Sequence, residues 1–78
     1  MSTETVIEIL KGIRPECDFA GADDFFAGGM LDSFDLTMLV SALEEHFGVG
    51  IDGADIIPEN FQNVKAIEAL IARYGVAG

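Results

Sequence analysis

Three consecutive residues, Asp32, Ser33 and Phe34, are the part of this sequence best suited to carry a chemical group. An apolar pattern with helical spacing begins directly after them, which places them at the start of a predicted helix. A serine at such a place usually caps the helix, but Asp32 is itself a good N-cap, which leaves Ser33 on the first turn with its hydroxyl directed outward. A phosphodiester on that hydroxyl would meet the free N–H groups and the positive end of the helix dipole. The sequence therefore permits an anionic group on Ser33 without identifying it.

The predicted helix that follows Asp32 has one strongly apolar face. The residues of this face recur at the spacing of a buried helical stripe: Leu36, Leu39, Val40, Leu43 and Phe47. Asp35 falls on the third helical position, where a carboxylate is favourable to the positive helix end. Gly48 supplies a residue type that commonly ends a helix.

The other face of this helix predicts a contact surface. At about 100° per residue, a second set of side chains points away from the apolar stripe: Phe34, Met38, Ser41, Ala42 and Glu45. An exposed Phe34 and Met38, one turn apart and next to Ser33, are typical of a patch that binds partners. An acidic rim of this patch would come from Asp35, Glu44 and Glu45. The alternative is that Phe34 folds back against the preceding segment and that Met38 has no role.

The segment before Ser33 predicts one helix and one long loop. The helix is expected from Glu4 to about Arg14, capped by Thr3 or Ser2 and ended by Pro15. Residues 16–31 contain irregularly spaced phenylalanine and glycine residues. They predict an ordered loop that is anchored by its aromatic side chains and positions the serine, because loops of this length usually have a functional reason.

The segment after Gly48 predicts a short irregular stretch and a last helix. Residues 51–61 are weakly periodic and contain Pro58, which indicates one or two brief helical turns. Asn63 is expected to cap the last helix and Gly75 to close it. The inward face of this helix would consist of Val64, Ile67, Leu70, Ile71 and Tyr74. The expected fold is an all-α bundle of three main helices plus one short helix, forming one domain over residues 1–78.

The charge of the chain narrows the classes of partner. Fourteen acidic residues against four basic ones give a formal net charge of -10. Such a chain is repelled by nucleic acid and by anionic membrane surfaces, and is steered toward partners with basic patches. The alternative interpretation is that the negative charge serves only to keep the protein soluble. We expect a monomer that binds proteins, without nucleic acid and without a membrane span.

The remaining candidate sites are weak. Cys17 is the only cysteine, which excludes an internal disulfide and fits a reducing compartment. Neither Cys17 nor His46 has catalytic or metal-binding partners at useful spacing, and the acidic pairs at 23–24 and 52–55 do not match an EF-hand loop. No signal peptide pattern is present. We expect no catalytic residue, no metal, no enzymatic activity of its own and a cytoplasmic location.

The residues from Gly29 to Phe47, together with Gly48–Ile51 and Pro58–Phe61, resemble the acyl carrier protein family. The resemblance implies a small acyl-carrier-like bundle in which Ser33, beside Asp32, carries covalent 4'-phosphopantetheine. A phosphopantetheinyl transferase would attach this arm. The arm would then present an acyl or aminoacyl group as a thioester to partner enzymes. The helix after the serine would be the surface that loading enzymes and synthases recognise.

Departures from the family pattern indicate which pathway is served. Fatty-acid carriers usually have a Gly-x-Asp-Ser-Leu sequence and a glutamate where Met38 stands. Met30 and Leu31 before the Asp-Ser pair, with Phe34 after it, are closer to D-alanine carriers and to accessory carriers. We therefore expect an accessory or specialised pathway with an adenylating ligase or acyltransferase as loading enzyme. The alternatives are a housekeeping fatty-acid carrier and, in another class, an unmodified protein-interaction module.

Overall fold

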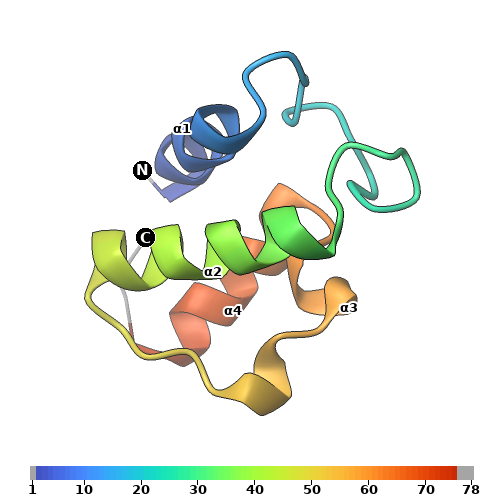
Figure 1. Cartoon of the computed structure of the whole chain (residues 1–78). Coiled ribbons are helices and arrows are strands. Elements are labelled where there is room, and N and C mark those ends of the chain that lie inside the picture. The colour runs from blue at the N-terminus through green and yellow to red at the C-terminus, as the bar shows by residue number, and fades with distance from the viewer. Residues whose placement is uncertain (1, 76–78) are drawn as a thin grey trace.

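The computed structural model describes residues 2–75, with the backbone alone for Ser2. The described residues form four α-helices and one short 3-10 helix, with no β-strand among them (Figure 1). The elements are α1 (Ser2–Ile13), α2 (Ser33–Phe47), η1 (Gly53–Asp55), α3 (Pro58–Phe61) and α4 (Val64–Arg73). No helix in this part of the chain has the length and apolar character needed to cross a membrane. The expected all-α bundle of three main helices plus a short one is confirmed.

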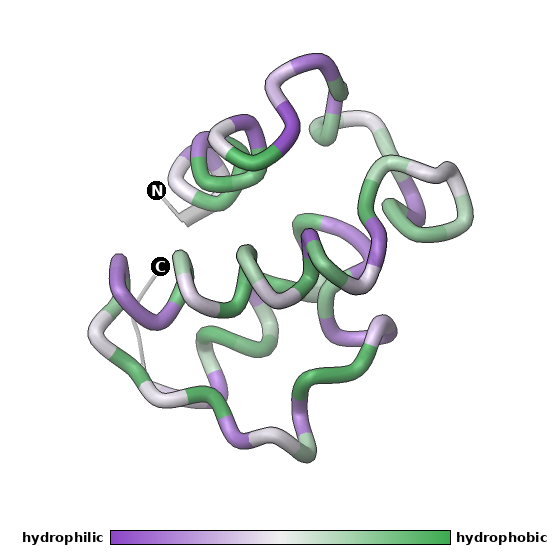
Figure 2. Tube along the Cα trace, viewed as in Figure 1, coloured by the Kyte–Doolittle hydropathy of each residue, from purple (hydrophilic) through white to green (hydrophobic). Residues whose placement is uncertain are grey.

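The three longer helices enclose an apolar core. α1 contacts both α2 and α4, and the short α3 packs on α4. In Figure 2 the hydrophobic residues of α1 lie along the side that faces α2. The deepest helical side chains are Val6, Leu10, Leu39, Leu43, Ile67 and Leu70. The predicted inward faces are therefore confirmed, and their outer members are partly buried against this core: Leu36, Phe47, Val64 and Tyr74.

Capping residues set both ends of α2 and the start of α4 as the sequence predicted. Asp32 caps the start of α2, and Gly48 ends it with a left-handed backbone at φ 68°. Asn63 Oδ1 accepts a hydrogen bond from the Ala66 N–H at 2.7 Å and so caps α4. These short polar and glycine residues satisfy backbone groups that have no partner within the helix.

The start of α1 differs from the prediction. The helix already begins at Ser2, so Thr3 lies inside it and its hydroxyl donates to the Glu68 carboxylate of α4. The expected cap at Thr3 is therefore wrong, because that hydroxyl has a tertiary partner. The alternative cap, the side chain of Ser2, lies outside the described residues.

The long segment between α1 and α2 is the predicted ordered loop. Phe19 and Phe25 are fully buried, and their rings meet edge to face with centroids 5.0 Å apart. The Phe25 N–H donates to the Gln62 carbonyl at 2.6 Å, which fixes the loop beside the end of α3. The Phe25 carbonyl in turn accepts from the N–H groups of Met30 and Leu31 at 2.8 and 3.2 Å. These contacts bring the chain to a defined place just before α2.

Leu39 and Leu43 are fully buried at the centre of α2, which gives a test of the packing. Leu39→Ala or Leu43→Ala should lower the free energy of unfolding by roughly 2–5 kcal/mol, because each leaves a cavity. Denaturant unfolding followed by circular dichroism measures this loss. Ser41→Ala on the exposed face of the same helix is the matched control, expected to change stability by less than about 0.5 kcal/mol. Equal effects of the leucine and serine substitutions would contradict this packing.

Candidate functional site

Ser33 is an exposed residue at the first position of α2. The cap before it is filled, because Asp32 Oδ1 accepts a hydrogen bond from the Asp35 N–H at 2.9 Å. Within the part of the chain that the structure describes, no hydrogen bond engages the Ser33 hydroxyl. The N–H groups of Ser33 and Phe34 precede the first bond of the helical ladder and have no partner within the helix. The site thus combines a free hydroxyl with free backbone donors.

Asp35 is the one charged side chain that is buried among the described residues, with 4 % of its surface exposed. Its Oδ2 accepts from the Asp32 N–H at 3.2 Å, which completes a reciprocal capping box. The same oxygen accepts from Arg14 Nε at 2.9 Å and lies 2.8 Å from Arg14 Nη2. Asp35 therefore joins the first turn of α2 to the residue that follows α1.

The protonation of Asp35 is set by these contacts. The hydrogen bond from Arg14 lowers the pKa of the Asp35 carboxyl below its ordinary value, and the Asp32 N–H adds to this effect. Burial acts in the opposite direction, because it disfavours the charged form. The direction of the shift shows that pairing prevails over desolvation. Asp35 is an ionised carboxylate near neutral pH.

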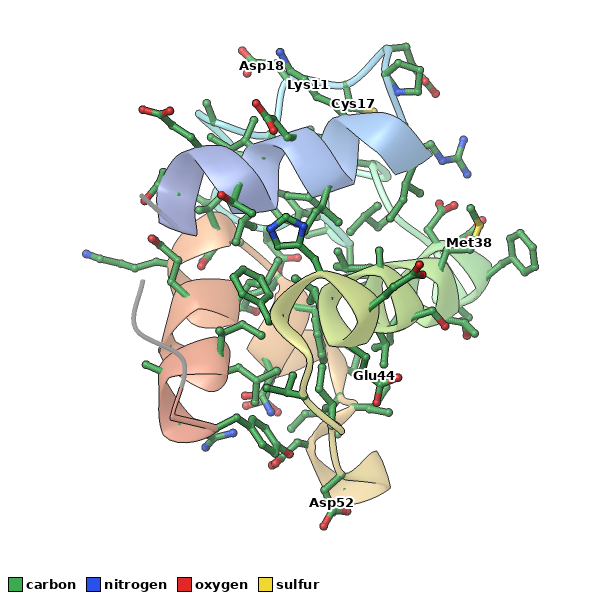
Figure 3. All side chains as sticks on the ribbon, turned by 90° about the vertical axis from the view of Figure 1, so that its left-hand side faces the viewer. Lys11, Cys17, Asp18, Met38, Glu44 and Asp52 are labelled. Atoms are coloured by element: carbon green, nitrogen blue, oxygen red, sulfur yellow. The ribbon has the colours of Figure 1, made fainter. Side chains whose placement is uncertain are left out.

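Two of the three residues expected to form an acidic rim are placed elsewhere. Asp35 lies one turn before Leu39, on the buried side of α2. Glu44 is half-buried, and its carboxylate accepts from the Ile51 N–H at 2.8 Å. Figure 3 shows Glu44 and Met38 on opposite sides of α2, with Glu44 beside the segment that follows the helix. The expected position of Asp35 and Glu44 on an exposed rim is therefore wrong, because both carboxylates bind groups of this chain.

The other predicted contact residues do share one exposed face. Phe34 is 72 % exposed and Met38 is 40 % exposed, and Glu45 is exposed on the same side of α2. Ser41 lies between them and is also exposed, whereas Ala42 is half-buried. Phe34 therefore does not fold back against the loop. We call Phe34, Met38, Ser41 and Glu45 the exposed α2 face.

The start of α2 fits an anionic group on Ser33. Asp32 and Asp35 bring two negative charges to this turn, but the Arg14 guanidinium lies 3.6 Å from the first and 2.8 Å from the second. Its positive charge offsets part of theirs, and the free N–H groups of the first turn favour an anion. Sequence reasoning did not assign Arg14 to the site. Two features of the sequence could have indicated this pair. Arg14 lies at the end of the first predicted helix, and Asp35 lies on the apolar side of the second, where a carboxylate needs a positive partner.

No other described group of side chains forms a comparable site. Among residues 2–75, no three histidine, cysteine, aspartate or glutamate side chains converge as metal ligands. Cys17 is a free, partly buried thiol. His46 lines an open groove between α1 and α2 with Ile9, Ala42 and Glu45. This groove borders the exposed α2 face.

Comparison with known families assigns the class of this protein. The family model for the phosphopantetheine attachment site matches residues 3–71, which is most of the chain, and the chain belongs to this family. Comparisons with curated proteins and with solved structures give no significant match. Domains of this family are the place where 4'-phosphopantetheine is attached covalently, and they act as carriers rather than catalysts. They bind phosphopantetheinyl transferases and acyl-processing enzymes.

The lowered pKa of Asp35 predicts how stability depends on acid. Its ionised form contributes stability above its ordinary pKa of 3.8, and this contribution is lost as the pH falls through the lowered value. The free energy of unfolding should therefore fall more steeply below about pH 4 in the wild type than in Asp35→Asn. Denaturant unfolding at a series of pH values measures both slopes. Glu59→Gln, which removes an exposed carboxylate from α3, controls for the loss of one charge. Parallel slopes for wild type and Asp35→Asn would contradict the assignment.

Proposed function

We propose that this chain is a carrier whose 4'-phosphopantetheine is attached to Ser33. One observation supports this most: the Ser33 hydroxyl is exposed and free because Asp32 already caps α2. The family match supports the cofactor itself. The whole of residues 1–78 would act as one carrier domain and as a monomer, in the cytoplasm, with no catalytic residue of its own.

In this proposal the residues of the chain have simple tasks. Ser33 Oγ forms a phosphodiester bond with the phosphopantetheine phosphorus of coenzyme A. The bond from that phosphorus to adenosine 3',5'-bisphosphate breaks, and the serine proton passes to a base of the transferase. The free N–H groups of Ser33 and Phe34 would stabilise the negative charge of this phosphodiester. When attached, the arm supplies a thiol that holds an acyl or aminoacyl group as a thioester, and tethering raises its effective concentration near partner enzymes.

We further propose that partner enzymes dock on the exposed α2 face. Phe34 and Met38 are exposed apolar side chains next to Ser33, where a partner must approach to reach the arm. Glu45 provides an exposed carboxylate on the same face, which suits a basic patch on the partner. Because Asp35 and Glu44 are engaged within this chain, the docking surface is more apolar than the acidic rim expected from the sequence.

The apolar character of this face favours an accessory or specialised pathway. Met38 stands where fatty-acid carriers usually have a glutamate, and its side chain is exposed to partners. A partner that binds Met38 and Phe34 needs an apolar recess on its surface. A partner that binds an acidic helix needs a basic surface instead. We propose an adenylating ligase or an acyltransferase as the loading enzyme, followed by synthases of the same pathway.

Ser33→Ala tests the attachment residue. The variant should fold, because Asp32 still caps α2, and it should no longer gain the arm when incubated with coenzyme A and a promiscuous phosphopantetheinyl transferase. Intact mass spectrometry measures the gain. Ser41→Ala, which removes another exposed hydroxyl of α2, should be modified like the wild type. If the wild type stayed unmodified, the alternative of an unmodified protein-interaction module would be favoured. If Ser33→Ala were modified, the attachment residue would not be Ser33.

Met38→Glu and Glu45→Lys test the docking surface. Met38→Glu should slow transfer from the loading enzyme without lowering thermal stability, because the side chain is outside the core, and should improve use by fatty-acid enzymes. Glu45→Lys should slow association most at low salt, where electrostatic steering is strongest. Loading kinetics of the phosphopantetheinylated variants measure both effects. Glu8→Lys makes the same change of charge at an exposed position of another helix, α1. If both α2 variants were loaded at the wild-type rate, partner enzymes would bind a surface other than the exposed α2 face.

A further inference from the structure

We propose that Arg14 and Asp35 are positioning residues for the modification of Ser33. Arg14 holds Asp35 Oδ2 against the Asp32 N–H, and this contact keeps the first turn of α2, with its serine hydroxyl, in the presented orientation. The inference rests on the proposed function, because it concerns how the same serine reaches a transferase. In this proposal Arg14 and Asp35 orient Ser33 within the chain and do not contact a partner protein.

The geometry concentrates three donors on one buried oxygen. Asp35 Oδ2 accepts from Arg14 Nε at 2.9 Å and from the Asp32 N–H at 3.2 Å, and Arg14 Nη2 lies 2.8 Å away. The side chain of Asp35 is 5 % exposed and that of Arg14 is 38 % exposed. Hydrogen bonds to a charged acceptor are short and strong, and the fork of an arginine fixes direction as well as distance. The contact therefore defines how α2 begins relative to the end of α1.

The first turn of α2 needs such a contact because its backbone is weakly held. The N–H groups of the first turn lack partners from a preceding turn, and helix ends open more readily than helix centres. A serine nucleophile must lie in line with the phosphorus that it attacks, and small displacements reduce the rate strongly. Loss of the Arg14 contact would free the Asp35 carboxylate to leave the capping box. The serine one residue after Asp32 would then sample other orientations.

The chain contains a matched control for this pair. Arg73, in the last turn of α4, is the other arginine that pairs with an aspartate among the described residues, with Nη2 3.3 Å from Asp55 Oδ1. Arg73→Ala removes one positive charge, as Arg14→Ala does, and breaks one arginine–aspartate ion pair, but it leaves the contacts at the start of α2 intact. Arg14→Ala also removes the longer ion pairs to Asp32 and Glu16, both at 3.6 Å. Both variants change the net charge by the same amount. A difference between their transfer kinetics therefore comes from where the arginine lies in the fold.

Transferase kinetics on the unmodified protein test the proposal. At a temperature where circular dichroism shows every variant folded, Arg14→Ala should lower kcat for transfer from coenzyme A about tenfold with KM changed less than about twofold, since a displaced nucleophile affects the reacting complex. Asp35→Ala should act in the same way, and Asp35→Asn replaces it if that variant does not fold. Arg14→Lys, which keeps the charge but not the fork, should recover part of the rate. Arg73→Ala should match the wild type.

A second readout does not depend on the transferase. Amide hydrogen exchange measured by NMR should show faster exchange at Asp32 and Asp35 in Arg14→Ala and unchanged exchange there in Arg73→Ala. The proposal is overturned if Arg14→Ala and Arg73→Ala have equal kcat. It is also overturned if Arg14→Ala raises KM alone with exchange unchanged, because Arg14 then contacts the transferase directly. An unmodified wild type, or a modified Ser33→Ala, contradicts instead the proposed function.

Discussion

The Asp35 carboxylate is the point on which the arrangement around Ser33 depends. A buried ion is costly unless it is paired and hydrogen-bonded, and Asp35 meets this condition only where the residue after α1, the end of the loop and the first turn of α2 come together. Breaking the pair leaves a buried carboxylate with too few donors. The constraint therefore acts in both directions: it stabilises the capping box, and it fixes the direction in which α2 leaves the loop.

The long loop brings the chain to this junction from the other side. Buried Phe19 and Phe25 anchor it in the core, and the Asn63 side chain, which also caps α4, donates to the Asp23 carbonyl at 3.0 Å. The loop before Ser33 is thus held beside α3 and α4, while Asp35, just after the serine, is held by Arg14, the residue that follows α1. The result is an exposed serine on a turn that is held from both sides, which suits a group attached for presentation to other proteins.

The sequence predicted the helices and the exposed place of Ser33 at the start of α2, because local signals set them. Asp32, Gly48 and Asn63 are local stop and start residues, and apolar spacing identified Leu39 and Leu43 as core. The fates of Asp35 and Glu44 depend on partners brought close only by folding: Arg14 is 21 positions before Asp35, and Ile51 follows a turn made by Gly48. Helical spacing did place Asp35 beside Leu39. The negative charge of Asp35 nevertheless favoured an exposed position in the prediction. A buried aspartate becomes favourable only when folding brings a partner such as Arg14 close to it.

We propose that Ser33 is the attachment residue because its hydroxyl is free beside a filled cap. The most direct measurement is peptide mapping by tandem mass spectrometry of the wild-type protein after reaction with coenzyme A and a phosphopantetheinyl transferase. We expect one modified peptide, with fragment ions that place the phosphopantetheine on Ser33. An arm found on Ser41 or Thr37, the other hydroxyl residues of α2, or no arm at all, would contradict it.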